Sequence, residues 1–423
     1  MGGHAFARAY APGAPTLNTP RMDPAEYHHV KDVYLQKIQF CLQDCKVAVM
    51  TEAPDKASYG DLDILIACDR TIDFIDLANS LRVAGVMCLS SKKASLAVQK
   101  DGTANLGPVT VYEQFLGGNQ DTSSPTVTEE EYAQLDIEVV PLNLFEWHRF
   151  YSSYGDMAGM IGHICHPLGF TINDRGLWLR LKELDFVKTV PYAAAADRDG
   201  MVFMSSCPTR VIEFLGCRAD QYEAGFQSLE QLYEWLAKCE LLSPDALKVR
   251  RDKAHERVRE QTRSVYAGFF KDYLPRHRDM QGETDAAKSA EVVAELRETW
   301  LQRAILEFSK REEYESKHAT LVRAINNGYA GHLLKPLVME HSQKIDKHAN
   351  EILRAFRRHV AFDTANHPHI AHTAHSDEES QLHKFLTDDH AALRDAEAAS
   401  VWVQMNWEGL RGLERQRGKG GSQ

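Results

Sequence analysis

The stretch KASYGDLDILI, residues 56–66, is the part of the sequence that decides the expected fold. Asp61 and Asp63 lie two positions apart, and the residues that follow them become fully apolar. Alternate side chains of a strand point to the same face, so a strand here places both carboxylates together. Two adjacent carboxylates repel each other unless a cation lies between them, and Mg²⁺ prefers oxygen ligands. The pattern therefore predicts a strand with a metal-binding end, where Gly60 lets a backbone or a nucleotide approach closely.

A second acidic residue at the start of an apolar strand occurs in LDIEVVP, residues 135–141. The segment before it, residues 116–131, has the composition of a loop throughout. Asp-x-Asp alone also fits a strand that carries two surface acids, but Asp136 favours a site. Three carboxylates on neighbouring strand ends suit the two-metal arrangement used for phosphoryl transfer.

The hydrophobic periodicity indicates how these strands are embedded. Apolar residues recur at helical spacing over residues 24–45, which predicts an amphipathic helix. A further helix and several short strands follow. The expected strands are residues 46–50, 61–67, 86–90, 95–99, 109–115 and 135–141, and the second helix covers residues 72–84. This order is typical of a mixed sheet with helices on one face, and from about residue 206 the pattern is almost entirely helical.

Three motifs carry a resemblance to a known family. The stretch at residues 56–66 resembles the first carboxylate motif of the DNA polymerase β superfamily of nucleotidyltransferases, particularly its X-family polymerases. LDIEVVPLNLF, residues 135–145, resembles the strand that carries the third carboxylate. YSSYGDMAGMIGHICHPLGFTINDRGLWL, residues 151–179, resembles the helix and turn that come next. The resemblance covers roughly residues 46–66 and 133–180, in the family's order.

The resemblance implies an α+β fold, with a polymerase β-type mixed sheet and helices followed by a mostly α-helical C-terminal half. We expect an N-terminal arm over residues 1–22, rich in Gly, Pro and Ala, that is flexible or draped over the next domain. The expected catalytic domain covers residues 23–205, the helical region residues 206–415, and a disordered tail residues 416–423.

The resemblance also implies roles for individual residues. Asp61 and Asp63 would bind two metal ions, Mg²⁺ or Mn²⁺. Asp136 would bind the catalytic ion and help to deprotonate an attacking 3′-hydroxyl. The implied reaction is in-line attack on the α-phosphate of a nucleoside triphosphate with release of pyrophosphate. Tyr151 falls where the family places an aromatic residue that touches the incoming sugar.

The sequence departs from the family in the phosphate-binding turn. The family has a Gly-Ser turn before its Asp-x-Asp, whereas MTEAPD stands here. Thr51 can replace the serine hydroxyl, and Lys56 and Ser58 are the remaining candidates for phosphate contacts. Glu52 and Asp55 would repel a phosphate.

A basic segment lies at residues 248–278 of an acidic chain. Arg250, Arg251 and Arg257 are candidates for nucleic-acid binding on a helix that lines the path of the substrate. A solvated helix with ion pairs four residues apart explains the same composition.

Composition limits the class of protein. The chain has 423 residues, of which 43% are hydrophobic, so a sizeable core is possible. Its net charge of −11 argues against a protein that coats DNA non-specifically. The eight cysteines include no CxxC pair, which favours free thiols in the cytosol or nucleus. No apolar run approaches the roughly 20 residues of a membrane helix, so we expect no membrane partner.

We therefore expect a metal-dependent nucleotidyltransferase that adds nucleoside monophosphates to the 3′ end of RNA or DNA. Template-independent addition is preferred, because no template-holding module is evident. Two alternatives stay open: transfer to a small molecule or a protein, and a catalytically degenerate binding protein on the same fold.

Overall fold

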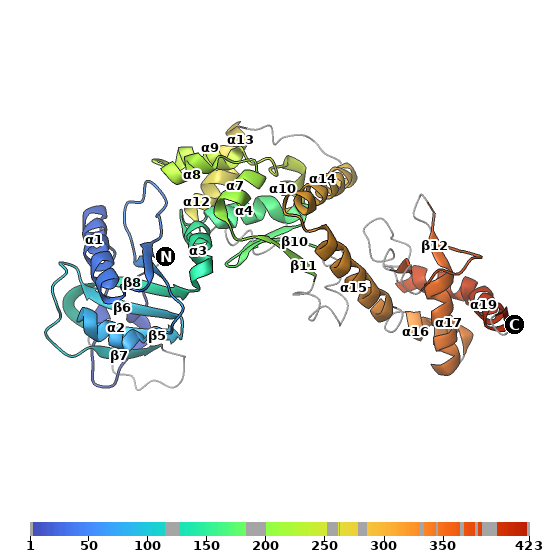
Figure 1. The fold of residues 1–423 in the computed structure, drawn as a ribbon, viewed down its shortest axis with the longest axis horizontal. Helices are drawn as coiled ribbons and strands as arrows, with labels where there is room; N and C mark the ends of the chain where they lie inside the picture. Colours follow the sequence, from blue (N-terminus) through green and yellow to red (C-terminus); the bar gives the residue numbers. More distant parts are fainter. Residues whose placement is uncertain are drawn as a thin grey trace. The chain divides into compact units, whose positions relative to one another are not determined.

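The computed structural model describes most of the chain, and two compact units are distinguished in it (Figure 1). The described residues are 3–114, 127–182, 200–251, 261, 263–277, 286–329, 334–343, 346–363, 368–376, 380–382 and 396–420. The first unit comprises Met1–Leu168, Ile172–Leu177 and Ser205–Leu296, and the second comprises Gly169–Thr171, Trp178–Met204 and Arg297–Gln423. The sheet and the helices just after residue 206 therefore belong to one unit.

A mixed sheet forms the centre of the first unit. Its strands run in the order β1-β7-β5-β6-β8-β4-β3, and β2 pairs with β8 beside this path. The strands are β1 (Ala9–Tyr10), β2 (Thr16–Asn18), β3 (Lys46–Val49), β4 (Leu62–Ala67), β5 (Gly85–Ser90), β6 (Lys93–Gln99), β7 (Thr110–Gln114) and β8 (Val127–Val140). Strand β4 is parallel to β8, whereas β6 is antiparallel to it. The expected mixed α+β class is confirmed.

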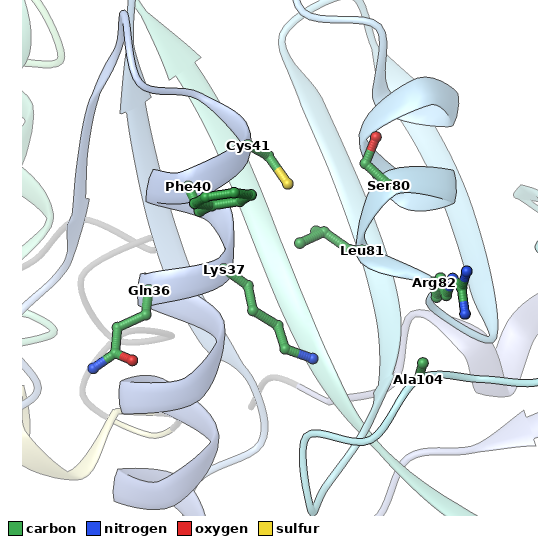
Figure 2. A pocket seen from close by; sticks show the side chains of 8 residues that line it. All are labelled: Gln36, Lys37, Phe40, Cys41, Ser80, Leu81, Arg82 and Ala104. Atoms are coloured by element: carbon green, nitrogen blue, oxygen red, sulfur yellow. The ribbon is translucent and has the colours of Figure 1, made fainter.

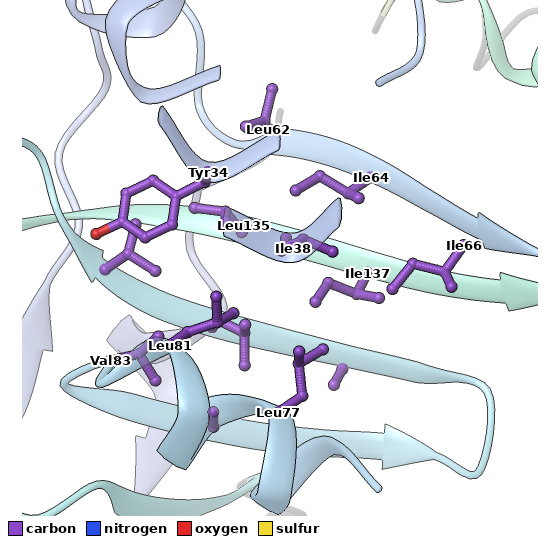
Figure 3. Close-up of a cluster of buried hydrophobic side chains, with 14 of the residues drawn as sticks. Tyr34, Ile38, Leu62, Ile64, Ile66, Leu77, Leu81, Val83, Leu135 and Ile137 are labelled. Carbon is purple, nitrogen blue, oxygen red and sulfur yellow. The ribbon is translucent and has the colours of Figure 1, made fainter. Parts of the chain in front are cut away.

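Helices α1 (Pro24–Cys41) and α2 (Phe74–Leu81) pack against one face of this sheet, here called the back face. Figure 3 shows Tyr34 and Ile38 of α1 and Leu77 and Leu81 of α2 with the apolar side chains of β4 and β8. The residues that β4 and β8 contribute to this cluster include Leu62, Ile64, Ile66, Leu135, Ile137 and Val139. They occupy alternate positions, because successive strand side chains point to opposite faces.

The N-terminal segment is draped over the sheet, which agrees with one of the two alternatives expected for it. We call residues 3–18 the N-terminal strap. Within it β1 pairs with β7, and β2 pairs in parallel with β8. Phe6 is completely buried and meets Tyr112 edge-on, with ring centroids 5.5 Å apart. The prediction that residues 116–131 are a loop throughout is wrong for 127–131, because pairing with β2 extends β8 back to Val127.

The chain continues from β8 into helices. The elements up to residue 277 are η2 (Leu142–Leu144), α3 (Phe145–Ser152), α4 (Met157–Cys165), η3 (His166–Leu168), α7 (Pro208–Phe214), α8 (Ala219–Ala224), α9 (Leu229–Ala237), α10 (Pro244–Arg251), α12 (Ser264–Ala267), η4 (Gly268–Tyr273) and α13 (Leu274–His277). Between η3 and α7 a small sheet has the order β11 (Met201–Ser205), β10 (Gly176–Arg180), β9 (Phe170–Asn173). Trp147 and Trp235 are fully buried in this part.

The described C-terminal part is mostly helical. Its helices are α14 (Ala286–Glu307), α15 (Arg311–Tyr329), α16 (Lys335–Ser342), α17 (Asp346–His359) and α19 (Ala396–Gly420). A hairpin of β12 (Val360–Phe362) and β13 (Pro368–Ile370) interrupts them. The expected tail from residue 416 differs from the structure up to Gly420, because α19 continues there and Arg415 and Arg417 pair with Glu351 and Glu414. Over the described residues, we find no helix with the length and apolar character needed to cross a membrane.

Candidate carboxylate site

The register of the sheet brings two of the predicted aspartates together. Asp63 of β4 lies directly opposite Asp136 of β8 in the parallel ladder, and Ser95 of β6 lies opposite Asp136 on its other side. Asp61 precedes β4 by one residue, two positions before Asp63, and therefore faces the same way. This face, opposite to the back face, is called the front face below.

Asp136 is held by two polar side chains that the sequence did not reveal. Ser95 Oγ donates a hydrogen bond of 2.6 Å to Asp136 Oδ1. Gln134 Nε2 donates to both oxygens of the same carboxylate, at 3.0 and 3.1 Å. Ser95 and Gln134 are 1% and 3% exposed. Partial burial raises the pKa of Asp136, the hydrogen bond from Ser95 opposes that rise, and the negative charge of Asp61 adds to it.

Asp63 stands among several negatively charged side chains. Loss of hydration among the surrounding groups raises its pKa to about 7, and the charges of Asp61, Asp136 and Glu52 contribute to the rise. Lys56 acts in the opposite direction. The Asp63 residue is nevertheless exposed to solvent. A carboxylate that is accessible yet destabilised by its neighbours gains from any cation that reaches it.

The three aspartates are suitable ligands for a hard divalent cation, but their carboxylates are not yet arranged around a common metal position. Within the described ranges, no group of three or more His, Cys, Asp or Glu side chains is already arranged as a metal site. Asp61 Oδ2 accepts the backbone N–H of Gly3 at 3.1 Å, and Asp136 accepts the bonds described above. Three carboxylates without sulfur or imidazole suit Mg²⁺ or Mn²⁺. A bound ion would have to draw Asp61, Asp63 and Asp136 toward a common position.

The acids of the altered turn are engaged in contacts with the protein. Asp55, which has a left-handed φ of 62°, accepts the backbone N–H of Leu229 at 3.0 Å, at the start of α9. Glu52 forms an ion pair with Lys56. Lys56 also lies over the ring of Tyr59, 5.2 Å from its centroid. The turn therefore packs against α9, while the positive charge of Lys56 is shared with Glu52.

Ser58 contacts a cation that the sequence did not point to. Arg21 Nε donates to Ser58 Oγ at 2.8 Å, and Arg21 Nη2 donates to the Ser58 carbonyl at 2.7 Å. Arg21 is exposed, and its partner Ser58 lies two positions before the buried Gly60. No local pattern could find Arg21, because the contact joins residues 37 positions apart.

Thr51 lines a polar hollow of about 570 Å³, to which α3, α7 and α8 also contribute residues. Its backbone N–H donates to Ser153 Oγ at 3.1 Å, and its carbonyl accepts the N–H of Tyr154 at 2.6 Å. Arg149, Ser153, Tyr154 and Tyr222 also line the hollow. Tyr151 is half-buried on α3 and does not line this hollow. The aromatic ring of α3 that does line it belongs to the neighbouring residue, Phe150.

A second hollow, of about 450 Å³, lies between α1 and α2 on the back-face side (Figure 2). Lys37 and Phe40 of α1 face Leu81 of α2 across it, with Arg82 at its edge. No carboxylate lines this hollow. It is therefore separate from the aspartate cluster.

The predicted nucleic-acid-binding arginines lie at the limit of the described chain. Arg250 and Arg251 end helix α10, and only their backbone is described. Arg257 lies outside the described residues. The basic segment therefore stays a prediction.

Comparison with known proteins leaves the chain without an assigned family. No model of a protein family matches it, and no curated protein matches it either.

Proposed function

We propose that this chain is a metal-dependent nucleotidyltransferase that adds nucleoside monophosphates to the 3′ end of a nucleic acid, with no template. The observation that carries the proposal is the register of β4 and β8, which sets Asp63 directly beside Asp136. Asp61 lies on the same face, and both Asp61 and Asp136 raise the pKa of Asp63. Three interacting carboxylates on adjacent strands, with Asp136 inside β8 rather than at its end, are the donor set that two-metal phosphoryl transfer requires.

The three aspartates would hold two Mg²⁺ or Mn²⁺ ions, which stabilise negative charge on the transferring phosphate. Asp136 would accept the proton of the 3′-hydroxyl. The hydroxyl oxygen forms a bond to the α-phosphorus, the bond to the bridging oxygen breaks, and pyrophosphate leaves.

The nucleotide would be held beside the aspartates by groups from three segments. Thr51 belongs to the hollow of about 570 Å³, a volume within the usual range of small-ligand sites. Thr51 adjoins Met50, whose N–H donates to the carbonyl of Asp63 at 3.3 Å, so the hollow adjoins β4. Lys56 and Arg21, with Ser58, supply the nearby cations and hydroxyl for phosphate contacts, in place of the family's Gly-Ser turn.

The test is the extension of an oligonucleotide whose 3′-hydroxyl is free. Single-stranded RNA and DNA, labelled at the 5′ end, are incubated with the chain, Mg²⁺ or Mn²⁺ and each nucleoside triphosphate in turn. We expect stepwise growth at the 3′ end by the wild-type chain and none by Asp63→Asn. The matched control is Asp69→Asn, an exposed acid beyond the other end of β4.

Two other outcomes would point to the alternative functions. In the first, label from an α-labelled triphosphate passes to the protein or to a small molecule, and the oligonucleotide does not grow. The acceptor would then be a protein or a small molecule and not a nucleic acid. Failure of calorimetry to detect binding of any triphosphate in the presence of Mg²⁺ would identify a binding protein on this fold. The observation that supports this last alternative is Glu52 of the altered turn, whose negative charge adds to the rise in the pKa of Asp63.

A further inference from the structure

The N-terminal strap is anchored close to its contacts with the aspartate cluster by several groups. Phe6 is fully buried in a cluster with Leu17 and Tyr112. Thr19 Oγ1 donates a hydrogen bond of 3.2 Å to the carbonyl of Gly3. Tyr112 also donates its hydroxyl to the carbonyl of Pro15 at 2.8 Å. These contacts hold the strap's backbone in place independently of the carboxylates.

From this anchored position the strap aims two backbone N–H groups at the candidate site. The N–H of Gly3 donates to Asp61 Oδ2 at 3.1 Å. The N–H of Ala5 donates to Gln134 Oε1 at 3.0 Å. Gln134 then donates through its amide nitrogen to both oxygens of Asp136. One contact therefore reaches Asp61 directly, and the other reaches Asp136 through a side chain that is 3% exposed.

The first of these contacts requires glycine at position 3. Gly3 has a φ of +86°, and a Cβ added to it would lie 2.2 Å from the carbonyl oxygen of Gly60. Any larger residue must therefore move the strap away from Gly60, the residue next to Asp61. Gly13 offers a comparison within the same strap, because its φ is +73° but no atom lies within 4 Å of an added Cβ.

We propose that the N-terminal strap is a positioning element of the metal site, which orients Asp61 through the Gly3 amide and Asp136 through Gln134. This role rests on the proposed function, because it assumes that the aspartates bind divalent cations. Groups that hold metal ligands by hydrogen bonds set the orientation of those ligands before the ion arrives. In the absence of metal, the strap contacts would keep Asp61 and Asp136 oriented toward the site although their like charges repel each other.

The test measures Mn²⁺ affinity of the full chain by electron paramagnetic resonance and calorimetry, without nucleotide. We expect Gly3→Ala to weaken Mn²⁺ binding about tenfold or more, within the range of about 10–100-fold for loss of a group that hydrogen-bonds to a metal ligand. Gly13→Ala, which imposes a similar backbone strain without the clash, should leave the affinity unchanged. Thermal unfolding without metal, compared between these two variants, separates loss of ligand orientation from loss of fold.

A second variant tests the other branch of the contact. Gln134→Met keeps the volume of the side chain but removes the donors to Asp136 and the acceptor for Ala5, so Mn²⁺ binding should again weaken about tenfold. Gln99→Met is the control, because Gln99 donates to Glu130 on the same pair of strands but away from the aspartates.

The results separate the strap from the metal site itself. Mn²⁺ affinity that is unchanged, or tighter, in Gly3→Ala and Gln134→Met would overturn the positioning role while leaving the site in place. Tighter binding would mean that the Gly3 amide competes with the cation for Asp61. Absence of Mn²⁺ binding by the wild-type chain would instead overturn the metal site, and with it the proposed function.

Discussion

The two faces of the central sheet use the same strands for different purposes. On the back face, Leu62, Ile64 and Ile66 of β4 are completely buried under α1 and α2. On the front face, Leu65 and Ala67 are buried with Phe145 at one end of β4, but Asp63 near the other end is exposed. Apolar burial thus holds the strand in place, and that support lets the front face carry charges that repel one another.

The largest expected effect separates the chemistry of the front face from the stability of the sheet. Asp63→Asn should lower the rate of nucleotide addition by about a thousandfold or more, because charge stabilisation by the metal site contributes several kcal/mol. The variant should fold at least as stably as the wild type without metal, since one of the repelling charges is gone. Rates are measured by oligonucleotide extension and stability by thermal unfolding.

Asp69→Asn provides the control for that experiment and should change neither rate nor stability. If Asp63→Asn kept the full rate, the exposed end of β4 would not be part of the catalytic site.

The next effect concerns the back face. Ile64 is completely buried, so Ile64→Ala should destabilise the sheet by about 2–5 kcal/mol. Hydrogen exchange at the amides of β4 and β8 reports the free energy of opening of these strands directly. Ile75→Ala on α2, where the side chain is 41% exposed, should cost about 0.5 kcal/mol or less. Equal losses in the two variants would contradict a back face held by burial.

A smaller effect is the pH dependence that Asp63 contributes. Its pKa rises from an ordinary 3.8 to about 7 in the folded chain, so the folded state binds more protons than the unfolded state between these values. The stability that Asp63 contributes is therefore present at low pH and is lost as the pH rises through that window. We expect the unfolding temperature of the metal-free wild type, relative to Asp63→Asn, to fall between pH 4 and about 7.

Mg²⁺ should reverse this trend at the upper end of the window, because it favours the ionised carboxylate. A difference between wild type and Asp63→Asn that stays constant with pH would show that Asp63 ionises in the folded chain as it does in the unfolded chain.

The smallest effect tests how α1 covers the back face. The Asp23 carboxylate accepts the backbone N–H of Glu26, and the Glu26 carboxylate accepts the backbone N–H of Asp23, which forms a capping box at the start of α1. Asp23→Ala should therefore cost about 1 kcal/mol, seen as faster hydrogen exchange in the first turn of α1. Asp32→Ala, an exposed position within the same helix, should cost less, because alanine favours the helix interior. A larger loss of stability in Asp32→Ala than in Asp23→Ala would show that the capping box does not stabilise α1.

Local patterns predicted the elements on both faces but not the groups around the aspartates. The alternation in residues 61–67 was sufficient to predict β4 and to place Asp61 and Asp63 on one face, because that periodicity lies within a single segment. Ser95 gave no such signal, since a serine in a strand is ordinary until the antiparallel register sets it opposite Asp136. Arg21 was missed for the same reason, as its partner Ser58 lies in another segment.

By itself, the sequence determined the kind of strand that carries the acids, the mixed α+β class and the helical character of the second half. These follow from side-chain periodicity, which lies within single segments of the chain. Only the tertiary structure decided that β8 pairs with β4 at Asp63 and Asp136, and that the strap reaches Asp61. The strap's contact with Gln134 joins residues 129 positions apart. Pairings of that kind depend on how separate apolar surfaces are buried together, which no single segment of sequence encodes.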